Sequence, residues 1–204
     1  MSLRSFLSIT ITILLALAAS PETSGNEAAS PDSLTPPLSV LTGGCSTTGV
    51  DTPSEFVDLV DCLFAFERDH SLAQLSPAVQ ARFSPYVSIL NSGRAQFNSI
   101  MKNQLLPAFT PQQNAEFSQL ITTSGVLDEA DAYITFLNTP VSTPRALQDE
   151  KNAKAQFRDT LQKIINYLID QLPDDEFWKP IKATLKELAA KIFEILNVLG
   201  KTGK

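Results

Sequence analysis

Few residues in this chain have side chains that could carry out covalent or metal chemistry. The 204 residues include one histidine, His70, and two cysteines, Cys45 and Cys62. A catalytic triad or a two-histidine zinc site needs partners that a single histidine without a nucleophile motif does not have. His70 ends an apolar helical pattern, where a cation interacts favourably with the helix dipole. We therefore interpret His70 as a helix-terminating residue and predict that the protein is not an enzyme, binds no metal and uses no cofactor.

Two further motifs imitate binding sites without meeting their requirements. The run Gly200-Lys201-Thr202 matches the end of a phosphate-binding loop, but Ile195 stands where that loop requires a glycine. The carboxylates Asp128, Glu129 and Asp131 could bind calcium weakly or transfer protons. Acidic residues are also typical of the first turn of a helix, which is how we interpret this group.

The two cysteines are placed to form a disulfide bond. In an oxidising compartment a lone pair of cysteines so close in sequence generally forms a bridge. Cys62 falls on the flank of a predicted helix, so it faces a neighbouring segment. The apolar stripe of that helix consists of Phe56, Leu59, Val60, Leu63 and Phe64. We predict that Cys45 and Cys62 are joined; two free thiols are the alternative.

The beginning of the chain indicates such a compartment. Residues 1–18 combine a positive charge at Arg4, an apolar run and small residues at a cleavage position. The apolar run is short for a bilayer span of about 20 residues and is interrupted by Ser8, Thr10 and Thr12. We expect a secretory signal peptide and a secreted, extracellular mature chain without a transmembrane span; a signal anchor is the alternative.

The rest of the chain divides into a tail and one domain. Residues 19–50 are rich in Ser, Thr, Pro and Gly and lack a helical period, which predicts a disordered segment. Residues 51–200 show repeated helical patterns and are expected to form one helical bundle domain. Residues 201–204 are expected to be a disordered C-terminus.

One helix-start signal recurs through this domain. A hydroxyl residue is followed by proline at Thr52-Pro53, Ser76-Pro77, Ser84-Pro85, Thr110-Pro111 and Thr143-Pro144. The hydroxyl can accept a hydrogen bond from a free amide, and proline lacks an amide that would be unpaired there. Thr52 and Glu55 also match a capping box. The pattern predicts that these pairs begin helices.

The fold class follows from these signals. We predict an all-α protein, a single multi-helix bundle of about six or seven helices. The expected helices cover residues 53–69, 77–91, 94–106, 111–123, 126–138, 144–172 and 175–199. We expect a break or kink near Pro85, a turn or weak point at 91–93 and a cap at Gly125.

The last predicted helix combines an apolar seam with a basic face. Six lysines and two glutamates give residues 178–204 a net charge of +4, although the whole chain carries −6. The seam consists of Ile181, Leu185, Leu188, Ile192, Ile195 and Leu199, with Trp178 at its start. The basic face consists of Lys179, Lys182, Lys186 and Lys191. The preceding helix has a similar seam at Phe157, Leu161, Ile164, Leu168 and Leu172, which favours an antiparallel helical hairpin.

Two interpretations of this helix remain open. We favour packing through the seam within the bundle, with the lysines in solvent. The alternative is a face that contacts a protein partner or an anionic membrane through Trp178 and the lysines. Weak peripheral membrane contact is compatible with both.

The acidic charge argues against a nucleic-acid surface, which needs a basic patch. Bulky apolar residues are abundant, including 12 phenylalanines. We therefore expect a secreted, non-enzymatic helical protein that binds an apolar ligand or lipid within the bundle. The alternative is a secreted protein-interaction, effector or structural module; membrane activity through the last helix is the third hypothesis.

Overall fold

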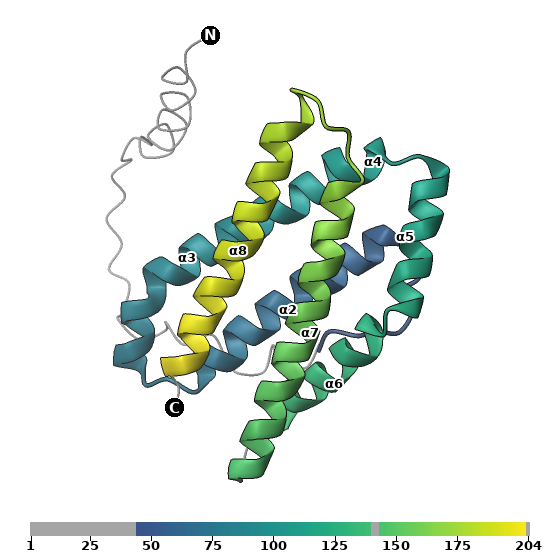
Figure 1. Cartoon of the computed structure of the whole chain (residues 1–204). Coiled ribbons are helices and arrows are strands. Elements are labelled where there is room, and N and C mark those ends of the chain that lie inside the picture. Colours follow the sequence, from purple (N-terminus) through teal and green to yellow (C-terminus); the bar gives the residue numbers. More distant parts are fainter. Residues whose placement is uncertain (1–43, 140–142, 203–204) are drawn as a thin grey trace, which may run out of the picture. The chain divides into compact units, whose positions relative to one another are not determined.

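The computed structural model of the chain describes residues 44–139 and 143–202, and every regular element in these ranges is a helix (Figure 1). This confirms the predicted all-α bundle. The elements are α2 (Pro53–Ala73), α3 (Pro77–Ile100), the π-helical segment η2 (Met101–Leu105), α4 (Leu106–Ala108), α5 (Pro111–Thr123), α6 (Val126–Asn138), α7 (Pro144–Asp170) and α8 (Trp178–Thr202). The predicted signal peptide (1–18), the tail as far as residue 43 and residues 203–204 lie outside the described residues.

Four of the five Ser/Thr-Pro pairs begin a helix as predicted. The hydroxyl of Thr52 accepts a hydrogen bond from the Glu55 amide at 3.3 Å, and the Glu55 carboxylate accepts one from the Thr52 amide at 2.9 Å. Thr110 caps α5 in the same way with Gln113, whereas Thr143 caps α7 only by accepting a hydrogen bond from the Ala146 amide. Ser76 precedes α3, but its side chain makes no capping hydrogen bond.

The prediction for the fifth pair, Ser84-Pro85, is wrong. Pro85 lies inside α3, which also runs without interruption through the expected turn at 91–93. The two helices predicted at 77–91 and 94–106 are therefore one, and it continues into η2 and α4. Tertiary packing explains why the helix continues through residues 91–93. A Cβ added at Gly93 would lie 3.8 Å from Ile192 of α8, so α8 packs against this weak point and stabilises the helical conformation of α3 there.

The remaining helix boundaries are close to the predicted ones. α5 and α6 match the expected ranges, and Gly125 between them has the left-handed φ of 78° that favours glycine at a cap. α8 begins at Trp178 rather than at 175, because the Asp175 carboxylate accepts a hydrogen bond from the Trp178 amide at 2.9 Å. It ends at Thr202, so Lys201 and Thr202 are helical instead of disordered.

The hydrophobic core is continuous and draws on all the long helices. In the α8 seam, Leu185, Ile192, Ile195 and Leu199 are buried, whereas Trp178, Ile181 and Leu188 are half-buried against the core. α7 and α8 run antiparallel after the turn that joins them (Figure 1). However, α8 packs more extensively along α3 than along α7, and the main partner of α7 is α6.

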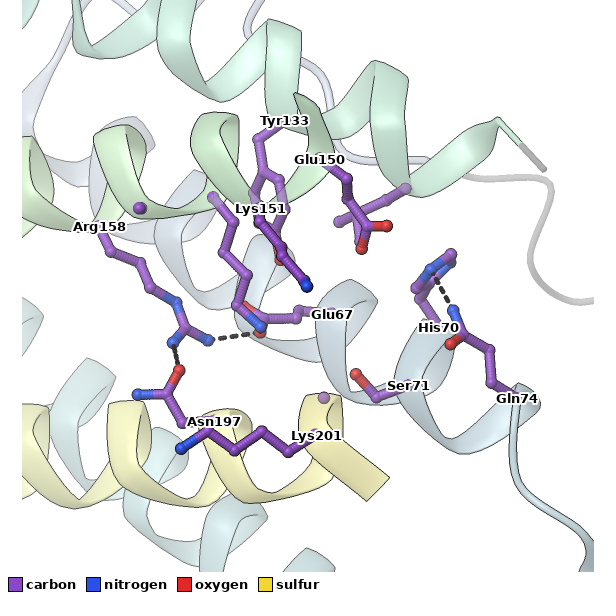
Figure 2. A pocket seen from close by; sticks show the side chains of 14 residues that line it. Glu67, His70, Ser71, Gln74, Tyr133, Glu150, Lys151, Arg158, Asn197 and Lys201 are labelled. Atoms are coloured by element: carbon purple, nitrogen blue, oxygen red, sulfur yellow. Dashed lines mark hydrogen bonds and ion pairs between the residues drawn. The ribbon is translucent and has the colours of Figure 1, made fainter. Parts of the chain in front are cut away.

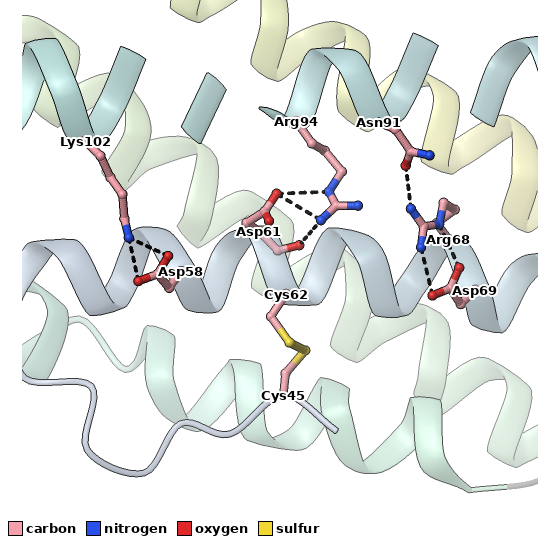
Figure 3. Close-up of polar contacts among 9 residues, drawn as sticks. All are labelled: Cys45, Asp58, Asp61, Cys62, Arg68, Asp69, Asn91, Arg94 and Lys102. Atoms are coloured by element: carbon pink, nitrogen blue, oxygen red, sulfur yellow. Dashed lines mark hydrogen bonds and ion pairs between the residues drawn. A yellow bond between two sulfur atoms is a disulfide. The ribbon is translucent and has the colours of Figure 1, made fainter. Parts of the chain in front are cut away.

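Polar contacts and a disulfide hold the surface of α2 (Figure 3). Asp58 pairs with Lys102 of η2 at 2.6 Å, and Asp61 pairs with Arg94 of α3 at 3.0 Å. Cys62 forms the predicted disulfide with Cys45, with a Cα–Cα distance of 5.7 Å.

This bridge belongs to an ordered segment that precedes the helices. Cys45 and Val50 are both buried in the core, so the packed structure begins before residue 51, the expected start of the domain. Across residues 44–139 and 143–202, no helix is both long and apolar enough to cross a membrane.

Candidate functional site

A pocket of about 560 Å³ lies between α2, α6, α7 and α8 (Figure 2). Most of the residues in its walls are polar, and they carry both signs of charge. α2 contributes Glu67, His70, Ser71 and, just after its end, Gln74; α6 contributes Tyr133 and Leu137; α7 contributes Glu150, Lys151, Lys154, Ala155 and Arg158; α8 contributes Asn197, Gly200 and Lys201.

A buried carboxylate occupies the inner end of this pocket. Glu67 continues the apolar stripe of α2, three and four residues beyond Phe64 and Leu63, so the helix geometry directs it into the bundle. Its carboxylate pairs with the Lys154 ammonium at 2.5 Å and with the Arg158 guanidinium, both from α7. The side chain of Glu67 is only 4% exposed.

The cations reach Glu67 because of their spacing on α7. Glu150, Lys154 and Arg158 are four residues apart and therefore lie on one face of the helix. Figure 2 shows the labelled side chains of this face extending from α7 toward α2. The pocket is thus lined by one charged stripe on α7 and by the end of the core stripe on α2.

The ionisation states follow from burial and charge together. Burial raises the pKa of Glu67, but the charges of Arg158 and Lys154 and their hydrogen bonds outweigh burial and leave this pKa below its usual value. Burial lowers the pKa of Lys154, and the neighbouring Glu67 offsets only part of this effect. Burial and the charge of Glu67 raise the pKa of Tyr133 well above its usual value. At neutral pH, Glu67 is therefore ionised and the Tyr133 hydroxyl keeps its proton.

α8 closes the inner end of the pocket and orients Arg158. The Arg158 guanidinium donates a hydrogen bond to the Asn197 side chain and lies 5.6 Å from the centre of the Phe193 ring. Gly200 leaves room for Lys154, because a Cβ at this position would lie 3.0 Å from the Lys154 ammonium nitrogen. Arg158 is thus held in place by contacts beyond its ion pair, and Lys154 occupies space that the glycine leaves open.

The pocket has an excess of positive charge. Its walls carry four cationic side chains and two carboxylates, a net charge of +2 with His70 neutral, in a chain whose net charge is −6. Lys151 and Lys201 form no ion pair with any described residue. A concave basic site on an acidic protein is suited to bind an anion.

The residues that the sequence singled out lie in several places. His70 lines the pocket beside Gln74, but it does not end α2, which continues to Ala73. Asp128 and Glu129 lie in the first turn of α6, as we interpreted them, whereas Asp131 lies beyond that turn. The described residues contain no group of three or more side chains that could hold a metal ion.

The basic face of α8 lies near the turn between α7 and α8, away from the pocket-lining end of the helix. Three of its four lysines pair with acidic residues of that region. The pairs are Lys179–Glu176 at 3.2 Å, Lys182–Asp174 at 3.0 Å and Lys186–Asp170 at 3.4 Å. Lys191 is exposed and has no ion pair with a described residue. The pairing neutralises much of the face that was considered for membrane contact.

Reasoning from the sequence missed the central residues of the pocket, Glu67, Lys154 and Arg158. A signal was present: an acidic residue occupies a core position of the α2 stripe, which is rare without a partner. Lys154 and Arg158 have the four-residue spacing needed to meet it. Nothing in the sequence indicates that these two helices face each other at this point.

Comparisons of the chain with models of protein families, with curated proteins and with solved structures find no match. The pocket between α2, α6, α7 and α8 is therefore the feature from which a function can be inferred.

Proposed function

We propose that this chain is a secreted, non-enzymatic binding protein that holds a small amphipathic anion in the pocket between α2, α6, α7 and α8. The excess of cationic side chains on the pocket walls carries this proposal. Lys154 and Arg158 share the single carboxylate of Glu67, and Lys151 and Lys201 add charge that no described residue neutralises. An acidic group entering the pocket would supply the missing counter-charge.

The size and the walls of the pocket support a ligand with an organic part. A volume of about 560 Å³ lies within the range of roughly 300–1,000 Å³ that is common for small-molecule sites. Leu137, Ala155 and the ring of Tyr133 provide apolar surface beside the charges. The ligand is therefore expected to combine an acidic group with a short apolar portion.

The composition suggested an apolar ligand within the bundle. This proposal specifies a ligand that also carries an acidic group and places it in the charged pocket. The void enclosed by Phe56, Phe97, Met101, Leu161 and neighbouring core residues has a volume of about 10 Å³. Such a void holds about one water molecule and no organic ligand. The charged pocket is thus a better location for a lipid-like molecule than this part of the core.

The disulfide supports the extracellular part of the proposal. Bridges such as Cys45–Cys62 persist in oxidising compartments and are rare in reducing ones. A binding protein that works outside the cell also has access to small amphipathic molecules in the surrounding fluid.

The test is a comparison of three eight-carbon probes by isothermal titration calorimetry. We expect octanoate and octyl phosphate to bind the disulfide-bonded chain with a Kd of about 1 mM or tighter, and neutral octanol to bind more weakly. Equal binding of octanol would favour the apolar-ligand hypothesis over ours. No binding of either anion would contradict the proposal and favour a protein-interaction module.

Charge-reversal variants locate the site. Lys151→Glu and Lys201→Glu change exposed lysines of the pocket and should each weaken octanoate binding severalfold. Lys191→Glu is the matched control, because Lys191 is an exposed lysine of α8 that does not line the pocket. If Lys191→Glu weakens binding as much as Lys201→Glu, the anion binds through general surface charge and not in this pocket.

A further inference from the structure

The two carboxylates of the pocket have very different surroundings. Glu67 interacts with three donor side chains, the ammonium of Lys154, the guanidinium of Arg158 and the hydroxyl of Tyr133. Glu150 lies one helical turn before Lys154 on the same face of α7 and is 9% exposed. It forms no hydrogen bond and no ion pair with any described residue.

A largely buried side chain whose carboxylate has no ion pair is unusual, because charged groups are normally paired where most of the side chain has left water. The carboxylate oxygens of Glu150 still reach the open space of the pocket. Glu150 is part of the pocket wall, so its free acceptor positions are available to whatever occupies the pocket. Figure 2 shows its carboxylate directed from α7 into the space above α2.

The nearby cations of the chain do not meet this need. Lys154 and Glu150 attract each other, but the ammonium of Lys154 forms its ion pair with Glu67, at 2.5 Å, and none with Glu150. Lys151 follows Glu150 directly, and neighbouring residues in a helix point in different directions. His70 has its Nε2 atom 2.6 Å from the Gln74 side chain.

We infer that the ligand carries an ammonium group in addition to its acidic group, and that Glu150 binds this ammonium while the lysine and arginine side chains bind the acid. This inference rests on the proposed function and specifies the ligand class as a small zwitterionic amine. An ammonium is favoured over a hydroxyl because it adds a full positive charge opposite the carboxylate, whereas a hydroxyl would supply a hydrogen bond alone.

The positions on α7 limit the separation of the two ligand groups. Residues four apart in a helix have Cα atoms about 6 Å apart, so Glu150 and Lys154 are separated by one turn. An acid bound at Lys154 and an ammonium bound at Glu150 are then several ångströms apart. Medium-length ω-amino carboxylates have this separation.

The experiment compares matched probes with and without the amine. Calorimetry on the full disulfide-bonded chain measures 6-aminohexanoate against hexanoate and 8-aminooctanoate against octanoate. We expect the amine to tighten binding of at least one pair by about tenfold. In a merely apolar pocket the added charge would weaken binding. Whether the amine tightens or weakens binding therefore decides between an ammonium site and a merely apolar pocket.

Variants test whether Glu150 is responsible. Glu150→Gln keeps the size of the side chain and should abolish the advantage of the amine while binding hexanoate at least as tightly as the native chain does. Glu150→Asp keeps the charge and should retain part of the advantage, which separates a lost contact from a damaged fold. Lys163→Gln is the control, since Lys163 lies on α7 with a 73% exposed side chain and does not line the pocket.

Each outcome has a distinct meaning. If hexanoate and octanoate bind but their amines bind no more tightly, the inference is overturned and the proposed anion site stands. If the amine advantage survives in Glu150→Gln, Glu150 is not the ammonium site and the inference is overturned. If none of the four probes binds, the proposed function fails together with the inference.

Discussion

Glu67 of α2 and Lys154 of α7 meet at 2.5 Å within the helical bundle, with side chains that are 4% and 19% exposed. Arg158, one turn further along α7, pairs with the same carboxylate. Two cations and one carboxylate are therefore withdrawn from solvent together. Three charges in this arrangement tie α2 to α7 and also form the inner wall of the pocket.

Glu67→Gln should destabilise the chain strongly. The variant leaves Lys154 and Arg158 largely buried without their counter-charge, and breaking a buried pair in this way costs about 3–5 kcal/mol. Urea unfolding followed by circular dichroism measures the loss. Asp159→Asn is the control, because it breaks only the exposed Lys163–Asp159 pair and should change the unfolding free energy by about 0.5 kcal/mol or less. Equal losses in the two variants would contradict the buried network.

The same carboxylate should contribute to acid sensitivity. The pKa of Glu67 is lower in the folded chain than its usual value of 4.5, so the unfolded chain binds this proton more readily. The stabilising contribution is thus complete above pH 4.5 and is lost as the pH falls through the folded pKa. Urea unfolding of the native and Glu67→Gln chains is compared from pH 7 to pH 3, which separates the effect of Glu67 from that of other titrating groups. The difference in unfolding free energy between the two chains should shrink below about pH 4.5. A constant difference would indicate that Glu67 is not ionised in the fold.

Removal of the disulfide should destabilise the bundle without changing its helices. Cys45 and Cys62 are 17 residues apart, and closing a loop of this length limits the unfolded chain by about 3 kcal/mol in the entropy model. We expect the double variant Cys45→Ser, Cys62→Ser to lose about that amount in thermal unfolding, with an unchanged helical spectrum at low temperature. Mass spectrometry after alkylation without reductant should find no free thiol in the native chain; two modified cysteines would refute the bridge.

Two leucines of the α8 seam should differ in their importance. Leu185 is fully buried, whereas Leu188 is half-buried between α3 and solvent. Leu185→Ala should cost about 2–5 kcal/mol of unfolding free energy and Leu188→Ala clearly less, because the cost depends on the cavity left behind. Leu188→Asp should still destabilise the chain, although by less than Leu185→Asp. If the alanine variants melt alike, the orientation of α8 described here is wrong.

The chain should bind anionic vesicles weakly and without causing leakage. Trp178 is half-buried against the core, and Lys179, Lys182 and Lys186 are engaged with Glu176, Asp174 and Asp170. The remaining attraction should disappear at high salt, because exposed charges are screened within about 8 Å at physiological ionic strength. Trp178 fluorescence and release of a trapped dye measure this. A blue shift with leakage that persists in high salt would favour membrane activity.

Local sequence was sufficient for most of the helix boundaries. Thr52, Thr110 and Thr143 begin helices because the cap and the proline act within a few residues of each other. The Cys45–Cys62 bridge was predictable for a similar reason, since only one pairing exists. Local signals failed at Pro85, which lies inside α3, and at Gly93, where α8 packs against α3.

The sequence by itself determined the fold class, the apolar stripes and the pairing of the two cysteines, because these depend on periodicity and short-range chemistry. Only the tertiary structure decided that α8 packs chiefly along α3, and that Glu67 of α2 faces Lys154 and Arg158 of α7. Helical periodicity specifies which face of a helix is buried but not which helix will cover it. The partner is chosen by packing of the whole core, and the pocket exists only where four helices converge.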